Sequence, residues 1–342
     1  MLVVLLALAV GAVLLALHLF VRPAAAGTCT VTLEDGTAAE LDADQAANAA
    51  LFAAVATHRE LPARAVSIAV ATAMQESRLR NIDYGDRDSV GLFQQRPSQG
   101  WGTVEQIMDP VYSTNAFYDV LVTVEGWQGQ EITDAAQRVQ RSAFPDAYAQ
   151  HEGPARAFAS ALTGHSPAAL ACHLDPVDDQ SPAAGAAGGA AGTGTAAGAG
   201  TATGGGTAGE DGAPADGAAA AAANGPADAD AEASTPTQRL QVVQDRLARD
   251  FVDVTTAVAP GGLLTVDATS LPGGTDAGRL GWAVAHWAVA TASETGASVV
   301  AVDGRAWLRA DGDDAGWVPL DRAPEAVATA AATAGPGAVV IG

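Results

Sequence analysis

Apolar residues recur at helical spacing through much of the first half of the chain. From Asp44 onward, residues such as Leu51 and Val55 return on one helical face. A second helix is expected to begin at Pro62, since proline is favoured in the first helical turn, and to end near Glu76. The same patterns predict further helices over 104–108, 110–124, 133–140 and 154–162, and a short strand over 29–33. Residues 27–175 therefore predict a mainly α unit.

The C-terminal part of the chain mixes helical and strand patterns. Helices are predicted over 238–251 and 280–293, and strands over 263–266, 298–302, 306–310 and 337–341. Residues 237–342 therefore predict a small α/β domain.

Two segments differ from both units in composition. Residues 1–22 are almost uniformly apolar and long enough to cross a bilayer, which predicts an N-terminal transmembrane helix. We favour an uncleaved anchor. The alternative is a cleaved signal peptide, because Ala24-Ala25-Ala26 has the small residues of a cleavage site. Residues 176–236 are rich in Gly and Ala with few large apolar side chains, which predicts a disordered linker.

The charge and the cysteine count narrow the possible partners. The formal net charge of −22 and the lack of a basic cluster argue against nucleic acid. Cys29 and Cys172 lie near the two ends of the first unit, in no metal-ligand spacing. In an exported protein they would form a disulfide; two unrelated buried thiols are the alternative. We expect no metal and no cofactor.

Glu76 is the candidate for chemistry. It ends an apolar helix, and a glycine-led turn, Gly91-Leu92-Phe93-Gln94, follows fifteen residues after Glu76. A carboxyl group kept partly dry in this way has a raised pKa and can donate a proton near neutral pH. Cleavage of a glycosidic bond needs such an acid. Amide and hydroxyl groups to hold an N-acetylated sugar are present nearby in Gln94, Gln95 and Tyr148.

These motifs resemble a known superfamily. Glu76-Ser77 followed by Gly91-Leu92-Phe93-Gln94 is similar to the paired motifs of lytic transglycosylases and goose-type lysozymes. The run from Ala71 to His151 is more closely similar to an actinobacterial membrane-anchored, lysozyme-like family. The shared segments are Gly91 to Pro97, Gln99 to Gly102, Asp109 to Tyr112 and Phe144 to Tyr148. The resemblance covers about residues 27–175 and implies a lysozyme-like fold.

The resemblance also implies roles for individual residues. Glu76 would be the catalytic acid/base, and Ser77, Gln94, Gln95 and Tyr148 would contact the Glu or the substrate. Asp86, within a loop similar to one of goose-type lysozymes, would be an accessory acid; if it or Asp88 positions a water, the outcome would be hydrolysis. One departure stands out: the third motif of transglycosylases is usually Ala-Tyr-Asn, whereas Ala149 follows Tyr148 here.

The expected protein is a single-pass membrane protein with extracellular domains that cleaves peptidoglycan between N-acetylmuramic acid and N-acetylglucosamine. It would act as a lytic transglycosylase or as a lysozyme. The alternative is an inactive, lysozyme-like protein for wall binding or assembly, and the C-terminal domain could have a wall or protein partner. Some members of the similar family have names of heavy-metal transporters, but one apolar span and the lack of a Cys/His cluster argue against transport.

Overall fold

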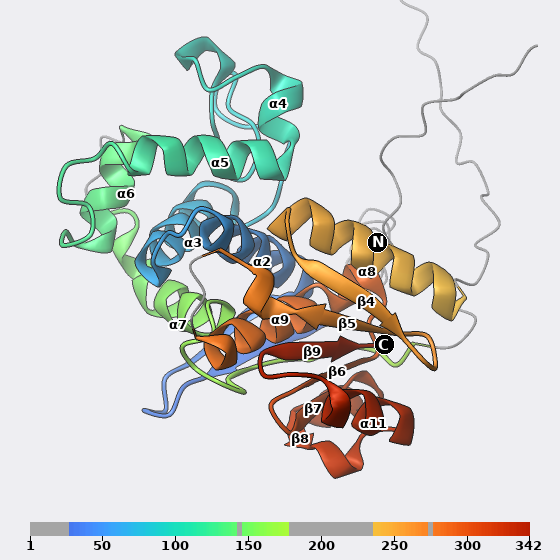
Figure 1. Ribbon diagram of the computed structural model, residues 1–342. Helices are drawn as coiled ribbons and strands as arrows, with labels where there is room; N and C mark the ends of the chain where they lie inside the picture. The colour runs from blue at the N-terminus through green and yellow to red at the C-terminus, as the bar shows by residue number, and fades with distance from the viewer. Residues whose placement is uncertain (1–26, 142–145, 178–234, 273–275) are drawn as a thin grey trace, which may run out of the picture.

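The computed structural model describes residues 27–141, 146–177, 235–272 and 276–342. Residues 27–141 and 146–177, called the first part below, contain a three-stranded antiparallel sheet in the order β2-β1-β3. The helices of this part pack on the sheet and above it (Figure 1). Its strands are β1 (Thr28–Thr32), β2 (Ala38–Asp42) and β3 (Leu170–His173). Its helices are α2 (Ala43–His58), α3 (Ala63–Ser77), α4 (Val104–Met108), α5 (Pro110–Leu121), α6 (Ile132–Gln140) and α7 (Glu152–Leu162), with 3-10 turns η1 (Pro97–Gln99) and η2 (Ala149–His151).

Residues 235–272 and 276–342, called the second part below, contain a six-stranded antiparallel sheet in the order β4-β5-β9-β6-β7-β8. Its strands are β4 (Thr255–Ala259), β5 (Leu263–Asp267), β6 (Val299–Val302), β7 (Arg305–Leu308), β8 (Trp317–Pro319) and β9 (Ala338–Ile341). Its helices are α8 (Pro236–Phe251), α9 (Ala277–Ala290), α10 (Ala292–Thr295) and α11 (Glu325–Thr333), with 3-10 turns η3 (Ala268–Ser270), η4 (Arg309–Asp314) and η5 (Leu320–Arg322).

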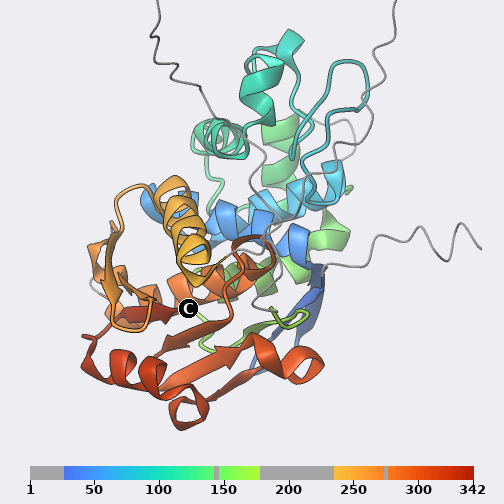
Figure 2. The ribbon, with the colours of Figure 1, turned by 90° about the vertical axis from the view of Figure 1, so that its right-hand side faces the viewer.

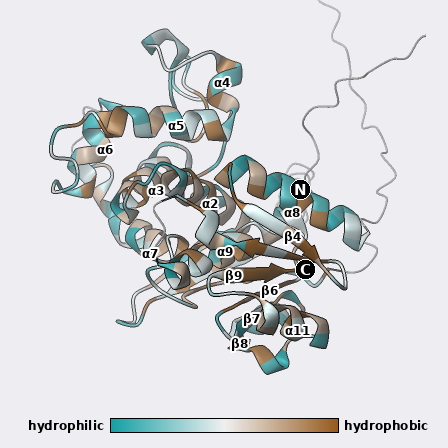
Figure 3. Ribbon diagram, in the orientation of Figure 1, coloured by the Kyte–Doolittle hydropathy of each residue, from teal (hydrophilic) through white to brown (hydrophobic). Residues whose placement is uncertain are grey.

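Alternation along the strands explains how the larger sheet is covered. Val300 and Ile341 belong to the large core that includes α9, whereas Val299 and Val340 pack with Val327 of α11. Successive side chains of a strand point to opposite faces, so the sheet lies between α9 and α11. In Figure 3 the central strands β9 and β6 are accordingly coloured as hydrophobic.

One hydrophobic core continues through both described parts. It joins residues of α2, α3 and α7 to residues of α8, α9 and the larger sheet. In the two views, α9 lies beneath α2 and beside α7 (Figures 1 and 2), and it contacts both helices and β3. The α2 helix is buried along most of its length, as expected for a helix that is apolar all round.

Hydrogen bonds reinforce this contact along β3. The indole Nε1 atoms of Trp307 and Trp317 donate to the carbonyl oxygens of Cys172 and Leu170, at 3.1 and 2.7 Å. A buried backbone carbonyl without a partner is costly, so these two bonds tie the second part to the strand that bears the disulfide.

A glycine permits the backbones of the two parts to pass close to each other after α7. A Cβ on Gly164, at the end of α7, would lie 1.8 Å from the carbonyl oxygen of Arg279 in α9. The φ angle of Gly164 is also +77°, which other residues rarely adopt. Arg279 closes the same contact from its side chain, donating from Nη1 to the carbonyl of Thr163 at 3.0 Å.

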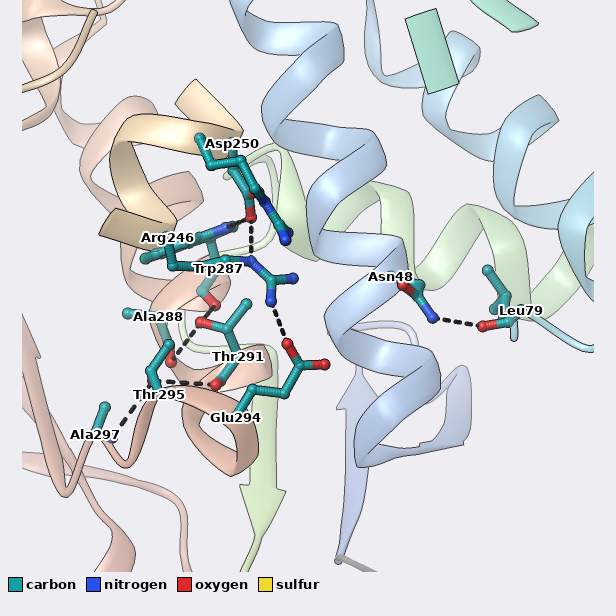
Figure 4. A network of polar contacts seen from close by, with 11 residues as sticks. Asn48, Leu79, Arg246, Asp250, Trp287, Ala288, Thr291, Glu294, Thr295 and Ala297 are labelled. Carbon is teal, nitrogen blue, oxygen red and sulfur yellow. Dashed lines mark hydrogen bonds and ion pairs between the residues drawn. The ribbon is translucent and has the colours of Figure 1, made fainter. Parts of the chain in front are cut away.

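A buried polar network attaches α8 to α9 and α10 (Figure 4). Asp250 is 1% exposed and accepts from Arg246 Nε at 2.8 Å, Arg249 Nε at 2.8 Å and Trp287 Nε1 at 2.9 Å. Arg246 also pairs with Glu294 of α10. A buried carboxylate is tolerated when it is paired and hydrogen-bonded in this way.

The predicted fold class is wrong in two respects. The C-terminal sheet is purely antiparallel, so this part is not the α/β domain that we expected from alternating helices and strands. The second respect is the expected N-terminal transmembrane helix, for which the described residues give no support. Trp282 and Trp287 of α9 belong to the same core as the buried residues of α2 and α7. The expected linker, residues 176–236, lies mostly outside the described residues.

The expected transmembrane helix at residues 1–22 lies outside the described residues. Within residues 27–141, 146–177, 235–272 and 276–342, no helix combines the length and apolar character needed to span a bilayer. The structure therefore gives the N-terminal transmembrane helix of the expected fold no support.

The predicted disulfide is confirmed. Cys29 of β1 and Cys172 of β3 are directly opposite in the antiparallel ladder, are both fully buried, and form a disulfide bond. The bond closes a loop with a sequence separation of 143 residues. In the chain-entropy account a loop of that size contributes about 5 kcal/mol to stability.

Cutting the chain between residues 178 and 234 is expected to leave the two described parts associated, because they share a core. A protease site placed in that segment, cleavage, and size-exclusion chromatography in native buffer would test this. The disulfide lies wholly within the N-terminal fragment, so it cannot hold the fragments together. Elution of two separate folded fragments would contradict the shared core.

Stability is expected to fall as the pH drops from about 6.5 to about 4, in part because of His286. Burial lowers the pKa of His286 from 6.5 to about 4, against a hydrogen bond between Nδ1 and the carbonyl of Ala161 that raises the pKa. The unfolded chain takes up a proton in this pH range that the folded protein resists. This difference of about 2.5 units corresponds to about 3 kcal/mol. Denaturant unfolding of the wild type and His286→Asn at pH 7 and pH 4 measures it. Equal losses of stability in the two proteins would contradict the assignment.

Candidate functional site

Glu76 lies at the C-terminal end of α3, where the chain turns sharply. Arg78 and Leu79 follow with φ angles of 56° and 58°, in the left-handed region that non-glycine residues seldom adopt. Two side chains of α2 stabilise this turn. Gln45 Nε2 donates to the carbonyl of Arg78 at 2.8 Å. Asn48 Nδ2 donates to the carbonyl of Leu79, also at 2.8 Å (Figure 4). Helix α2 therefore helps to fix the position of Glu76.

Ser77 connects this helix end to the glycine-led turn. Its side chain is buried, and its hydroxyl lies 2.7 Å from the carbonyl of Leu92 and 3.2 Å from that of Ala73. Ser77 was predicted to contact the Glu or the substrate. In the structure its hydroxyl holds the two motifs together.

The turn itself depends on backbone geometry. Val90 pairs with Gln95 in an isolated antiparallel bridge, and the Gly91 amide donates to the carbonyl of Ile82 at 2.7 Å. Gly91 has a φ of +80°, and an added Cβ would lie 3.0 Å from the carbonyl oxygen of Ile107. Glycine is thus required where the turn passes the end of α4.

The carboxyl group of Glu76 is largely shielded and hydrogen-bonded. The hydroxyl of Tyr148, itself 1% exposed, donates to Glu76 Oε1 at 2.8 Å. Burial raises the pKa of Glu76 above its ordinary value, while hydrogen bonds from Tyr148 and Gln140 lower it in part. The net effect favours the protonated acid, the form needed to protonate a leaving group.

Gln140 is a site residue that sequence reasoning missed. It ends α6, and its Nε2 donates to the carbonyl of Phe93 at 2.7 Å. Phe93 stacks between Phe52 and Phe117, with ring centroids 4.9 and 4.4 Å away. Gln140 thus joins the turn to the acid. Nothing in the local pattern of α6 distinguishes it from a surface glutamine.

Gln94 and Gln95 occupy different environments. Gln94 has a φ of 47°, and its Nε2 lies 3.2 Å from the carbonyl of Tyr84. Gln95 is 1% exposed and donates from Nε2 to the carbonyl of Ser113 in α5 at 3.1 Å. The structure therefore places Gln95 as a support for the turn, without an open face for a bound sugar.

The two predicted accessory acids differ in exposure and in their partners. The side chain of Asp86 is 89% exposed, and its nearest basic partner is Arg87 at 3.9 Å. Asp88 accepts from the Ser98 amide at 2.8 Å, the Ser98 hydroxyl at 3.0 Å and Arg96 Nε at 2.9 Å. These hydrogen bonds hold the pKa of Asp88 well below its usual range. Asp88 is therefore an ionised group that holds this loop together through Ser98 and Arg96.

Other features of the described residues do not add a second candidate site. No group of three or more His, Cys, Asp or Glu side chains among them is arranged to hold a metal ion. A cavity of about 790 Å³ lies between β4, β5 and α11, lined mainly by Ala, Thr and Gly, with Glu325 as its one charged lining residue. Its lining offers few side chains that could bind or transform a ligand. We therefore give more weight to the shielded Glu76 than to this cavity. Phe144 and Pro145, from the shared segment Phe144 to Tyr148, lie outside the described residues.

Comparison with known proteins adds no relative. No protein-family model matches the chain, and no curated protein matches it significantly. The site is therefore argued from its motifs and geometry.

Removing the hydroxyl of Tyr148 is expected to raise the pKa of Glu76 further, because the ionised carboxylate loses a donor. The change is Tyr148→Phe, followed by carbon-13 NMR titration of the Glu76 carboxyl. Tyr112→Phe is the control, since the Tyr112 hydroxyl donates to the carbonyl of Trp101. An unchanged or lowered pKa in Tyr148→Phe would show that the hydrogen bond does not act on the acid.

Proposed function

We propose that the protein cleaves peptidoglycan glycan strands outside the cell, between N-acetylmuramic acid and N-acetylglucosamine. Glu76 would first donate a proton and then take one back. The observation that carries this proposal is the raised pKa of a shielded carboxyl group at the junction of the two motifs. A lone surface glutamate at a helix end would have neither the burial nor the contact with Tyr148.

The chemistry needs little besides this one acid. Protonation of the bridging oxygen by Glu76 breaks the bond to the anomeric carbon, on which positive charge develops. In the transglycosylase route the 6-hydroxyl of the same muramic acid attacks that carbon, and its proton returns to Glu76. Atoms balance without water, and the product has a 1,6-anhydro end.

The surroundings of the aspartates favour this route over hydrolysis. An enzyme that inverts by activating water needs a second carboxylate to act as the base. Asp88 is fully engaged by Ser98 and Arg96, and Asp86 projects into solvent. We therefore propose the anhydro product as the principal outcome.

The disulfide supports action outside the cell. Structural disulfides persist in oxidising compartments and are rare in the cytosol. The Cys29–Cys172 bond is fully buried within the part that carries Glu76. An exported enzyme would have direct access to peptidoglycan.

Glu76→Gln is expected to reduce release of soluble muropeptides from purified peptidoglycan by at least about a hundredfold, since it removes the general acid. Glutamine keeps the shape of the side chain, so the far-ultraviolet circular dichroism and wall binding should be retained. Asp86→Asn is the matched control and should keep most of the activity, because Asp86 is exposed.

Mass spectrometry of the products separates the competing functions. Anhydro ends, lighter by one water than reducing ends, support the transglycosylase. Reducing ends would contradict the anhydro route and indicate a lysozyme. A folded wild type that binds peptidoglycan and releases nothing would contradict the enzyme and indicate a wall-binding protein.

A further inference from the structure

The segment directly after Tyr148 is fastened to the end of α3 at a second point. Gln75 Oε1 lies 3.1 Å from Gln150 Nε2 and 3.1 Å from His151 Nε2. Gln150 and His151 belong to η2, and η2 packs against α3. Adjacent residues of one helix, Gln75 and Glu76, therefore hold two neighbouring pieces of the same segment.

We propose that Gln75 is a positioning residue that keeps the hydroxyl of Tyr148 on the Glu76 carboxyl by clamping η2 against α3. Gln75, Gln150 and His151 are called the η2 clamp below. The consequence of the clamp for turnover rests on the function proposed above, whereas its effect on the Tyr148–Glu76 contact does not.

The segment around Tyr148 is attached to α3 at two points, Glu76 and Gln75. The packed ring of Tyr148 and its bond to Glu76 fix the buried side of the segment. The η2 clamp adds an anchor on the exposed side, one residue along α3. Within the segment, Gln150 Nε2 also lies 3.5 Å from the carbonyl of Ala147, so this contact spans the tyrosine.

The exposure of the participants makes a purely structural role a poor explanation. Gln75 and Gln150 are exposed, whereas Tyr148 is 1% exposed. Exposed amides could satisfy their hydrogen bonds with water, so the fold does not require them to meet. They meet directly beside the buried contact between Tyr148 and Glu76. His151 fits the clamp when the proton is on Nε2, and burial lowers its pKa and so favours the neutral ring.

A double-mutant cycle tests this proposal. Gln75→Ala is expected to raise the pKa of Glu76, measured by carbon-13 NMR titration, because the Tyr148 donor is held less well. In the Tyr148→Phe background, Gln75→Ala should produce no further shift, since the clamp acts through the hydroxyl. On peptidoglycan, Gln75→Ala should lower kcat roughly threefold to tenfold with little change in KM, and move the alkaline limb of the pH profile upward.

Two further variants keep the test decisive. Gln150→Ala/His151→Ala removes both donors and should reproduce Gln75→Ala. Gln241→Ala, which removes the exposed amide on α8 that donates to Asp245, should change neither the pKa nor the rate. Equal pKa shifts from Gln75→Ala in the two backgrounds, or no shift in either, would overturn the clamp.

The outcomes also separate the two proposals. An inactive wild type in which the cycle shows the expected coupling keeps the η2 clamp and removes the proposed function. An active wild type in which Gln75→Ala leaves kcat, the pH profile and the pKa unchanged keeps the function and removes the clamp.

Discussion

Burial of one carboxyl group at the end of an apolar helix is the constraint on which this site depends. Taking a carboxylate out of water favours its protonated form, and nearby donors limit how far that shift can go. Here burial outweighs the hydrogen bonds from Tyr148 and Gln140. Three features hold Glu76 in this environment. They are the left-handed turn after Glu76, the hydrogen bond from Ser77 to the carbonyl of Leu92, and the η2 clamp.

The C-terminal part contributes to this balance through packing. Its helix α9 lies against α2 and α7, and α2 in turn supplies the amides that hold the turn after Glu76. Trp307 and Trp317 bond to the strand that carries Cys172. A continuous core of this kind lets the second part stabilise the candidate site without contributing a residue to it.

Elements with strong periodicity could be predicted from the sequence, whereas short or alanine-rich ones could not. Apolar spacing located α2, α3 and the strands β5 and β6 closely. The strands β2, β3, β4 and β8 went undetected: β2 and β4 contain alanine, which has little strand preference, and β3 and β8 have only four and three residues. The helix α11 resembles the Gly/Ala-rich linker in composition. The motif located Glu76 and Tyr148, whereas Gln140 reaches the site only through tertiary packing, which no local pattern records.

Titration of the wild-type Glu76 carboxyl, followed by carbon-13 NMR in the folded protein, tests the central claim most directly. The structure predicts a pKa above 4.5, the ordinary value for this group, because desolvation outweighs its two hydrogen bonds. Exposed glutamates in the same spectra provide an internal reference. A Glu76 that titrates with them, or at lower pH, would contradict the claim that the fold raises the pKa of this side chain.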